Sequence, residues 1–198
     1  MANQTVKDAM SVKGTNPQYL VEKIIRYRVL NAISYIFLIL LGFRSRIYDS
    51  KYWKENCFAL TAELLVDKAM ELRLTLFSLH LTTKLFFLRY IGGVFGGNIK
   101  PTPFLCLVLK MLQIQPEKDI VIEFIKNEDF KYVRALGAYY LRLTGTALDC
   151  YKYLEPLLND YRKIRSQKRD GNFELTHMDE FIDSLLHDER VCDVQCPR

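Results

Sequence analysis

The stretch PTPFLCLVLKMLQIQPEKDIVIEFIKNEDFKYVRALGAYYLRLTG, residues 101–145, decides the fold that we predict for this chain. Its apolar residues recur at helical spacing, and prolines and acidic residues mark where each helix begins. We expect one buried helix from near Pro103, a second from Pro116, and a third over 129–145 that ends at its glycine. The stretch therefore predicts three consecutive helices.

The region before this stretch is also expected to be helical. Asn16 followed by Pro17 is a helix start, because asparagine caps the first turn and proline suits the first helical position. Residues 49–73 carry two adjacent apolar stripes, one of which contains Trp53 and Cys57. We expect one long helix there, buried on a broad face of the core.

The region after the stretch continues the same pattern. Thr146 caps a predicted helix over 146–165, which Pro156 kinks or divides in two. Residues 169–173, RDGNF, have the composition of a turn, and Thr176 caps a short final helix. No strand alternation of useful length is present, so we predict an all-α fold, a compact single-domain bundle of several helices.

The segment IGGVFGGNIKPTP, residues 91–103, raises the question of a phosphate-binding loop. The P-loop pattern fails, because Lys100 follows Gly97 by three residues and Pro101 comes next. A dinucleotide fingerprint needs a βαβ unit, which an all-α chain does not supply. We instead expect a structural loop whose glycines permit positive φ and close packing. Its residues are Gly92, Gly93, Gly96, Gly97, Pro101 and Pro103.

The reactive residues form no pattern typical of a catalytic, metal or cofactor site. The five cysteines lack a CxxC pair and fit reduced thiols better than a disulfide framework. The three histidines, His80, His177 and His187, stand in no metal-binding or triad arrangement. We therefore expect no enzyme activity, no cofactor and no small-molecule substrate.

The run YRKIRSQKR, residues 161–169, concentrates positive charge and has two interpretations. Its cations could contact RNA phosphates, or they could lie at the solvated end of a helix. We favour the second, because cations suit a helix C-terminus. The candidate RNA contacts are Arg162, Lys163, Arg165, Lys168 and Arg169.

Two apolar stretches, residues 29–43 and 74–88, leave a membrane protein as a further alternative. The first is shorter than the roughly 20 residues that a bilayer-spanning helix needs, and the second carries His80 and Lys84. The first ten residues are polar and lack the apolar core of a signal peptide. We expect no membrane attachment.

The chain closely resembles, in four collinear blocks, the amino-terminal domain of the pre-mRNA-splicing factor 38 family. The blocks are residues 14–26, 50–73, 92–165 and 173–193. The resemblance implies an all-helical, non-enzymatic scaffold of the spliceosome, located in the nucleus and acting around activation of the assembled complex. The implied partners are spliceosomal proteins of the microfibrillar-associated-protein type and the zinc-finger type, with RNA contact only inside the assembled complex.

Two segments, 27–45 and 74–90, depart from the family pattern. We interpret the domain as residues 1–191, interrupted by these two apolar inserts in inter-helix loops and followed by a divergent, truncated tail, 192–198, without arginine–serine repeats. The inserts contain no acidic residue, and we hypothesise that they are translated introns. They hold four cations, so only +1 of the net charge of +5 belongs to the rest of the chain. The basic charge is therefore weak support for nucleic-acid binding.

A scaffold of this kind should bind its partners on a helix face or groove with exposed aromatic side chains. The candidates are Tyr132, Tyr139, Tyr140, Tyr151, Tyr153 and Tyr161. A protein-interaction scaffold is the leading hypothesis, and a direct RNA-binding protein that uses residues 161–169 is the alternative.

Overall fold

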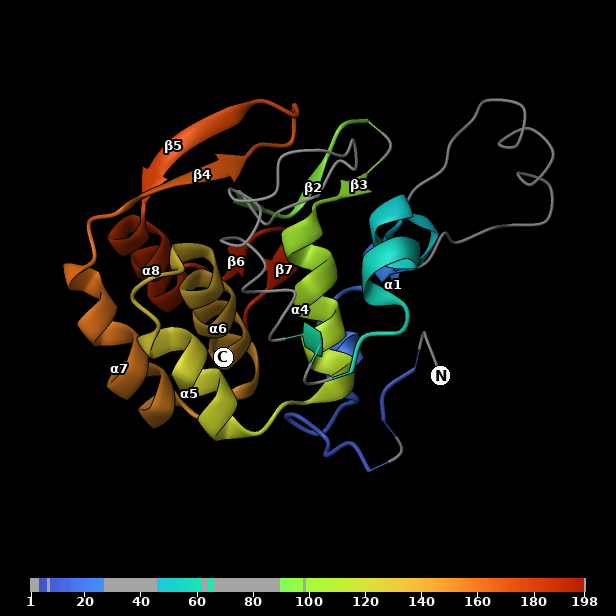
Figure 1. Cartoon of the computed structure of the whole chain (residues 1–198), viewed down its shortest axis with the longest axis horizontal. Coiled ribbons are helices and arrows are strands. Elements are labelled where there is room, and N and C mark those ends of the chain that lie inside the picture. The colour runs from blue at the N-terminus through green and yellow to red at the C-terminus, as the bar shows by residue number, and fades with distance from the viewer. Residues whose placement is uncertain are drawn as a thin grey trace, which may run out of the picture.

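The computed structural model shows a mixed α/β domain, so the predicted all-α bundle is wrong. Helices form most of the core, and three small sheets pack beside them (Figure 1). The structure describes residues 4–6, 8–26, 46–61, 64–65, 90–97 and 99–197. The two predicted inserts, 27–45 and 74–90, lie outside this part of the chain except for Tyr90.

Helix α4 (Pro103–Ile114) lies at the centre of the core. Thr102 caps its first turn, since the side-chain oxygen of Thr102 accepts a hydrogen bond from the N–H of Leu105 at 3.2 Å. All of its residues except Ile114 are buried, as expected of a helix that is packed on every side. The later helices lie on one side of α4 in Figure 1, and residues 46–61 lie on the other.

Helices α5 (Lys118–Lys126) and α6 (Lys131–Thr144) pack closely against each other. A Cβ atom on Gly137 of α6 would lie 2.8 Å from the Cβ of Phe124, so this approach requires glycine. Together with α4 they confirm the three predicted helices, although the second begins two residues after Pro116.

Helix α7 (Ala147–Leu154) is capped by Thr146, as predicted. It continues into a 3₁₀ helix over Glu155–Asn159, which confirms that Pro156 divides this segment. The chain then leaves the helical pattern, because the next residues form a strand.

The largest difference from the prediction is a β-hairpin where the end of a helix was expected. Strands β4 (Lys163–Gln167) and β5 (Phe173–His177) pair antiparallel across the predicted turn. The strand β4 is basic and buries only Ile164 fully, so its composition resembles that of a solvated helix end. Helix α8 (Met178–His187) follows, and His177 takes the N-cap position predicted for Thr176.

The other strands have only two residues each. Strand β1 (Ile91–Gly92) pairs in parallel with β4 and completes a sheet of order β1-β4-β5. Two further hairpins join β2 (Val94–Phe95) to β3 (Lys100–Pro101) and β6 (Arg190–Val191) to β7 (Val194–Gln195). Strands this short produce no alternating pattern, which is why the sequence did not indicate them.

The N-terminal helices are shorter than predicted. Asn16 caps a 3₁₀ helix over Pro17–Leu20, which confirms the predicted start, and α1 (Lys23–Arg26) follows. A second 3₁₀ helix covers Ile47–Asp49. The single helix predicted over 49–73 is not continuous, since a π-helix over Trp53–Cys57 is followed by a turn and residues 66–73 lie outside the described part.

Candidate partner-binding cleft

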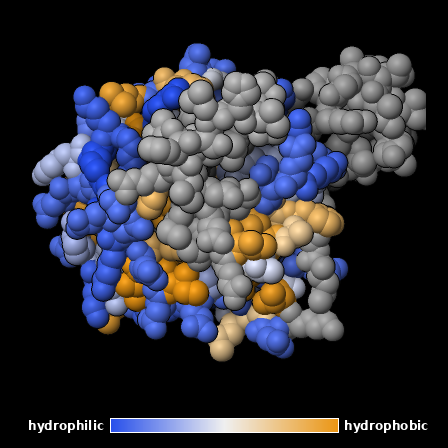
Figure 2. Space-filling view, in the orientation of Figure 1, coloured by the Kyte–Doolittle hydropathy of each residue, from blue (hydrophilic) through white to orange (hydrophobic). Residues whose placement is uncertain are grey.

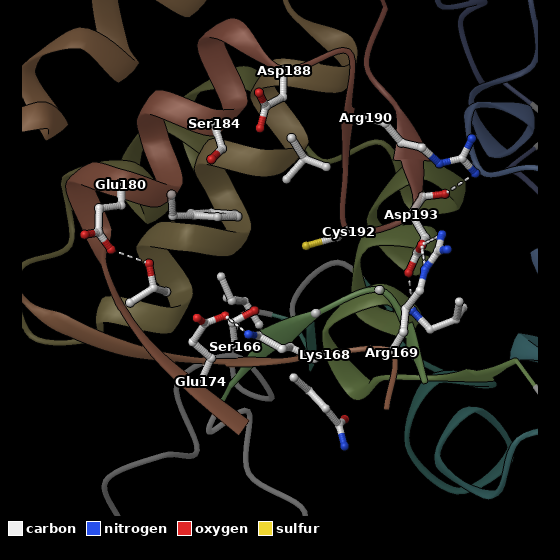
Figure 3. Close-up of a pocket in the computed structure, with 18 of the residues that line it drawn as sticks. Ser166, Lys168, Arg169, Glu174, Glu180, Ser184, Asp188, Arg190, Cys192 and Asp193 are labelled. Carbon is white, nitrogen blue, oxygen red and sulfur yellow. Dashed lines mark hydrogen bonds and ion pairs between the residues drawn. The ribbon is translucent and has the colours of Figure 1, made fainter. Parts of the chain in front are cut away.

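An open cleft of about 910 Å³ lies between the β4–β5 hairpin, α8 and the β6–β7 hairpin. Residues 91–94, which include Gly92 and Gly93, line its fourth side. Figure 3 shows labelled side chains of the two hairpins and of α8 around the shared space. Four segments that are distant in sequence therefore build one concave surface.

The β6–β7 turn forms one wall of the cleft. Its two central residues, Cys192 and Asp193, both have positive φ, at 48° and 62°, as in the tight hairpin turn that twists with its strands. Oδ2 of Asp193 accepts a hydrogen bond from the N–H of Val94 at 2.9 Å, and Oδ1 accepts one from Nε of Arg169 at 2.9 Å. Asp193 thus joins three sides of the cleft.

The close approach at this wall depends on a glycine. A Cβ atom on Gly93 would lie 2.3 Å from Oδ2 of Asp193 and 2.4 Å from the carbonyl oxygen of Cys192. Gly92 has a φ of 154°, and its carbonyl oxygen accepts a hydrogen bond from Oγ1 of Thr102 at 2.6 Å. The glycine segment therefore connects the cleft wall to the start of α4.

The residues predicted to form one structural loop are distributed over several elements. Gly92 belongs to β1 and Pro101 to β3, while Pro103 is the first residue of α4. Gly96, with a φ of 71°, and Gly97 turn the chain between β2 and β3. Their structural role, as opposed to phosphate binding, stays a prediction.

Helix α8 and its C-cap residue, Asp188, form the opposite wall, where Glu180, Ser184 and Asp188 line the cleft (Figure 3). Oε2 of Glu180 accepts a hydrogen bond from Oγ1 of Thr176 at 2.6 Å and one from the N–H of His177 at 2.9 Å. These two hydrogen bonds lower the pKa of Glu180. Glu180 is therefore ionised and fixed in position at neutral pH.

The cleft has an excess of negative charge. Counted over the described residues, its lining contains five acidic residues and three basic ones, and each of the basic residues already has an acidic partner in the chain. The cations are Lys168, paired with Glu174; Arg169, paired with Asp193; and Arg190, paired with Glu22. This arrangement favours basic partners and disfavours phosphate groups.

The one thiol in the cleft lining is not suited to nucleophilic chemistry. Burial raises the pKa of Cys192 to about 12, so its sulfur carries a proton at neutral pH. The ranges that the structure describes hold no cluster of three or more His, Cys, Asp or Glu side chains able to bind a metal ion. Within the same ranges, no helix combines the length and apolarity needed to cross a bilayer.

The five predicted RNA contacts do not form one free basic surface. Arg162 is half-buried and belongs to an ion cluster, in which its Nη2 and Nη1 of Arg134 each lie 2.6 Å from Oδ2 of Asp160. The guanidinium of Arg165 lies 4.4 Å from the ring centre of Phe173. Lys163 is exposed and is not among the residues that line the cleft, and Lys168 and Arg169 are paired in the cleft.

The six predicted partner-binding tyrosines also have different environments. Tyr132, Tyr139 and Tyr140 are buried, and Tyr153 is half-buried. Tyr151 and Tyr161 are exposed, at 57% and 69% of their surface. None of the six lines the cleft.

The cleft residues Glu180, Ser184, Asp188 and Asp193 were not among the sequence candidates, and no local motif marks them. The predicted tail, 192–198, contributes Cys192 and Asp193 to the cleft and buries Cys196.

Comparison with known proteins assigns the chain to a family. A sequence profile described as the PRP38 family matches residues 34–198. Pre-mRNA-splicing factor 38A of Xenopus laevis is 68% identical over 198 residues, which cover 100% of this chain and 53% of the relative. The human protein of the same name is 67% identical, with the same coverage. The chain thus spans about half the length of these relatives.

A solved structure agrees with this assignment. A chain in the crystal structure of the Snu23–Prp38–MFAP1(217–258) complex of Chaetomium thermophilum superimposes with a TM-score of 0.71 at 36% identity. The match covers 96% of the present chain and 81% of that chain. The fold, the sequence profile and the full-length relatives agree, and the chain described here belongs to the PRP38 family.

Proposed function

We propose that this chain is a non-enzymatic scaffold for protein–protein contacts in pre-mRNA splicing and that a partner binds in the acidic cleft. The names of its relatives support the splicing role. The similar solved chain comes from a complex of three proteins, which supports an interaction role. A nuclear location and action around activation of the assembled complex belong to the same proposal.

The excess of acidic residues in the cleft is the main observation that supports a partner-docking site there. Its walls are held by hydrogen bonds at Asp193 and Glu180, so the surface is formed before a partner arrives. Carboxylates in a preformed concave surface attract basic side chains and orient them on binding. Partners of the MFAP1 type and of the Snu23, zinc-finger type are the classes that we expect here.

The experiment places positive charge in the cleft without removing any hydrogen bond that holds its walls. Ser184→Arg and Asp188→Lys both act on the α8 wall. Glu155→Lys is the matched control, because Glu155 is exposed and lies outside the cleft lining. Affinity for purified MFAP1-type and Snu23-type fragments is measured by calorimetry, with circular dichroism to verify folding.

We expect at least one partner to bind the two cleft variants about tenfold more weakly, while the control stays within about twofold of wild type. Wild-type affinity of both cleft variants for both partners would contradict the docking site. Equal weakening by Glu155→Lys would show a general charge effect and would also contradict it.

A further inference from the structure

The outer strand of the β4–β5 hairpin has an open edge. The sheet order is β1-β4-β5, so β5 has a neighbour on one side only within the described residues. Figure 1 shows this strand at the periphery of the domain, and Figure 2 shows hydrophobic surface there within a largely hydrophilic border. Open strand edges are usually blocked in soluble proteins, since they pair readily with other chains.

The register determines which backbone groups face outward. The N–H of Lys168 donates a hydrogen bond to the carbonyl oxygen of Asn172 at 2.9 Å. The N–H of Met178 donates one to the carbonyl oxygen of Arg162 at 3.0 Å. Bonded and non-bonded pairs alternate along an antiparallel ladder. The backbone N–H and C=O groups of Phe173, Leu175 and His177 therefore point away from β4.

Only part of this edge is closed. The N–H of His177 donates to Oε2 of Glu180 at 2.9 Å, which ends the edge at that residue. Among the residues that the structure describes, none hydrogen-bonds to the outward backbone groups of Phe173 and Leu175. Within the described part of the chain, two adjacent outward rungs thus remain open.

The other edge of the hairpin, formed by β4, is blocked by side chains. Where β1 does not pair with β4, the ammonium of Lys131 donates to the carbonyl of Lys163 at 2.6 Å. The N–H of Arg165 donates to the hydroxyl of Tyr132 at 3.1 Å. Side chains therefore block the exposed backbone of β4, whereas β5 has no such block at Phe173 and Leu175 among the described residues.

The two faces beside the open edge differ in chemistry. On the outer face, Phe173 and Leu175 are 47% and 58% exposed, and Tyr90 lies against the Phe173 ring with centroids 5.0 Å apart. On the cleft face, Glu174 is half exposed and paired with Lys168, and Glu180 at the start of α8 lines the same cleft. An added strand would therefore meet apolar side chains on one face and carboxylates on the other.

We propose that β5 accepts a further strand from a partner protein, and that this strand alternates apolar and basic residues. The two open rungs supply main-chain hydrogen bonds, Phe173 and Leu175 pack on the apolar side chains, and Glu174 and Glu180 receive the basic ones. The acidic excess of the cleft face selects this charge pattern. The strand site shares Glu174, Leu175 and Glu180 with the lining of the docking cleft, but its main-chain hydrogen bonds do not depend on which partner fills the cleft.

The first test uses synthetic peptides on the full 198-residue chain. The probe is a capped octapeptide that alternates valine and lysine, and the comparison peptides are its valine–glutamate counterpart and one with four valines followed by four lysines. Amide hydrogen exchange of Phe173 and Leu175 is followed by NMR. We expect the alternating valine–lysine peptide to slow both amides by about tenfold or more, and the other two peptides to have little effect.

The second test compares two leucine-to-lysine variants for binding of the valine–lysine peptide. Leu175→Lys should weaken binding of the valine–lysine peptide by about tenfold, whereas Leu148→Lys, at an exposed leucine of α7, should leave it within about twofold. Unchanged exchange at Phe173 and Leu175, or equal slowing by the block peptide, would overturn the proposal. Concentration-dependent protection without peptide would also overturn it, because a second copy of this chain would then occupy the edge.

Discussion

Gly93 and Asp193 meet at the wall of the cleft with no room between them for a side chain on residue 93. A Cβ atom there would lie 2.3 Å from Oδ2 of Asp193, far inside the contact distance of two non-bonded atoms. The same oxygen accepts the hydrogen bond from Val94, so it cannot move away without losing that bond.

We expect Gly93→Ala to lower the free energy of unfolding by about 2 kcal/mol or more, because the added methyl group must displace the β6–β7 turn. Urea denaturation measures the change. Gly97→Ala is the matched control, since a Cβ at Gly97 meets no atom of the described residues within 4 Å. Similar effects of the two substitutions would show that steric exclusion at Gly93 is not the cause.

Thr102→Val tests the link between the glycine segment and α4. Oγ1 of the fully buried Thr102 donates to the carbonyl of Gly92 at 2.6 Å and accepts from the N–H of Leu105 at 3.2 Å. Valine has the shape of threonine but can bond neither to the carbonyl of Gly92 nor to the N–H of Leu105. We therefore expect a loss of about 2–3 kcal/mol in unfolding free energy.

Thr146→Val provides the comparison, because Thr146 caps α7 in the same way but at an exposed position. Thr146→Val should lower the free energy of unfolding by less than Thr102→Val does, by about 1 kcal/mol or less. An equal loss at both positions in urea denaturation would contradict the importance of burial at Thr102.

Asp160 should make stability depend on pH in the acid range. Burial favours the neutral carboxyl, but hydrogen bonds from Arg162 and Arg134 outweigh this effect and lower the pKa of Asp160 to about 2. A pKa below that of the unfolded chain stabilises the fold above about pH 4, and this contribution disappears as the pH falls toward 2.

We therefore expect Asp160→Asn to be less stable than wild type by about 2 kcal/mol or more at pH 7, with the difference shrinking between pH 4 and 2. Thermal unfolding across this pH range measures it. Asp188→Asn, at an exposed aspartate outside the ion cluster, is the control. A difference between Asp160→Asn and wild type that is constant with pH would contradict the ionic explanation.

Single-stranded RNA should bind this chain weakly. Arg162, Lys168 and Arg169 are each paired with a carboxylate, and Arg165 stacks on Phe173, so few cations of the run 161–169 can release counterions on binding. We expect fluorescence anisotropy with a uridine oligomer to give a dissociation constant in the range of about 10⁻⁴ M at physiological salt. Submicromolar binding with a steep salt dependence would instead support the RNA-binding alternative.

Features with local causes could be predicted from the sequence. The start of α4 at Pro103 and the cap at Thr146 each depend on a few neighbouring residues. The strand β4 could not be recognised, because its pairing with β1 and β5 is set by distant residues while its own composition suits a helix end.

The cleft was missed for a related reason. Asp193 accepts hydrogen bonds from Val94 and Arg169, which are distant in sequence and are brought to it by the fold. No motif near Asp193 indicates these contacts. Tyr139, a partner-binding candidate in the sequence, is fully buried, and its partner-binding role stays a prediction. The sequence does not distinguish an aromatic residue that faces the core from one that faces a partner, because both occur on apolar helix faces.

The hydrogen bond between Val94 and Asp193 joins residues 99 positions apart. Because a nascent chain emerges from its N-terminus, β1, β2 and α4 leave the ribosome long before the turn that completes the cleft. Contacts over such separations form late in folding as well. A ribosome that pauses ahead of codon 193 would thus hold a domain with its central helices present and one wall of its cleft still missing.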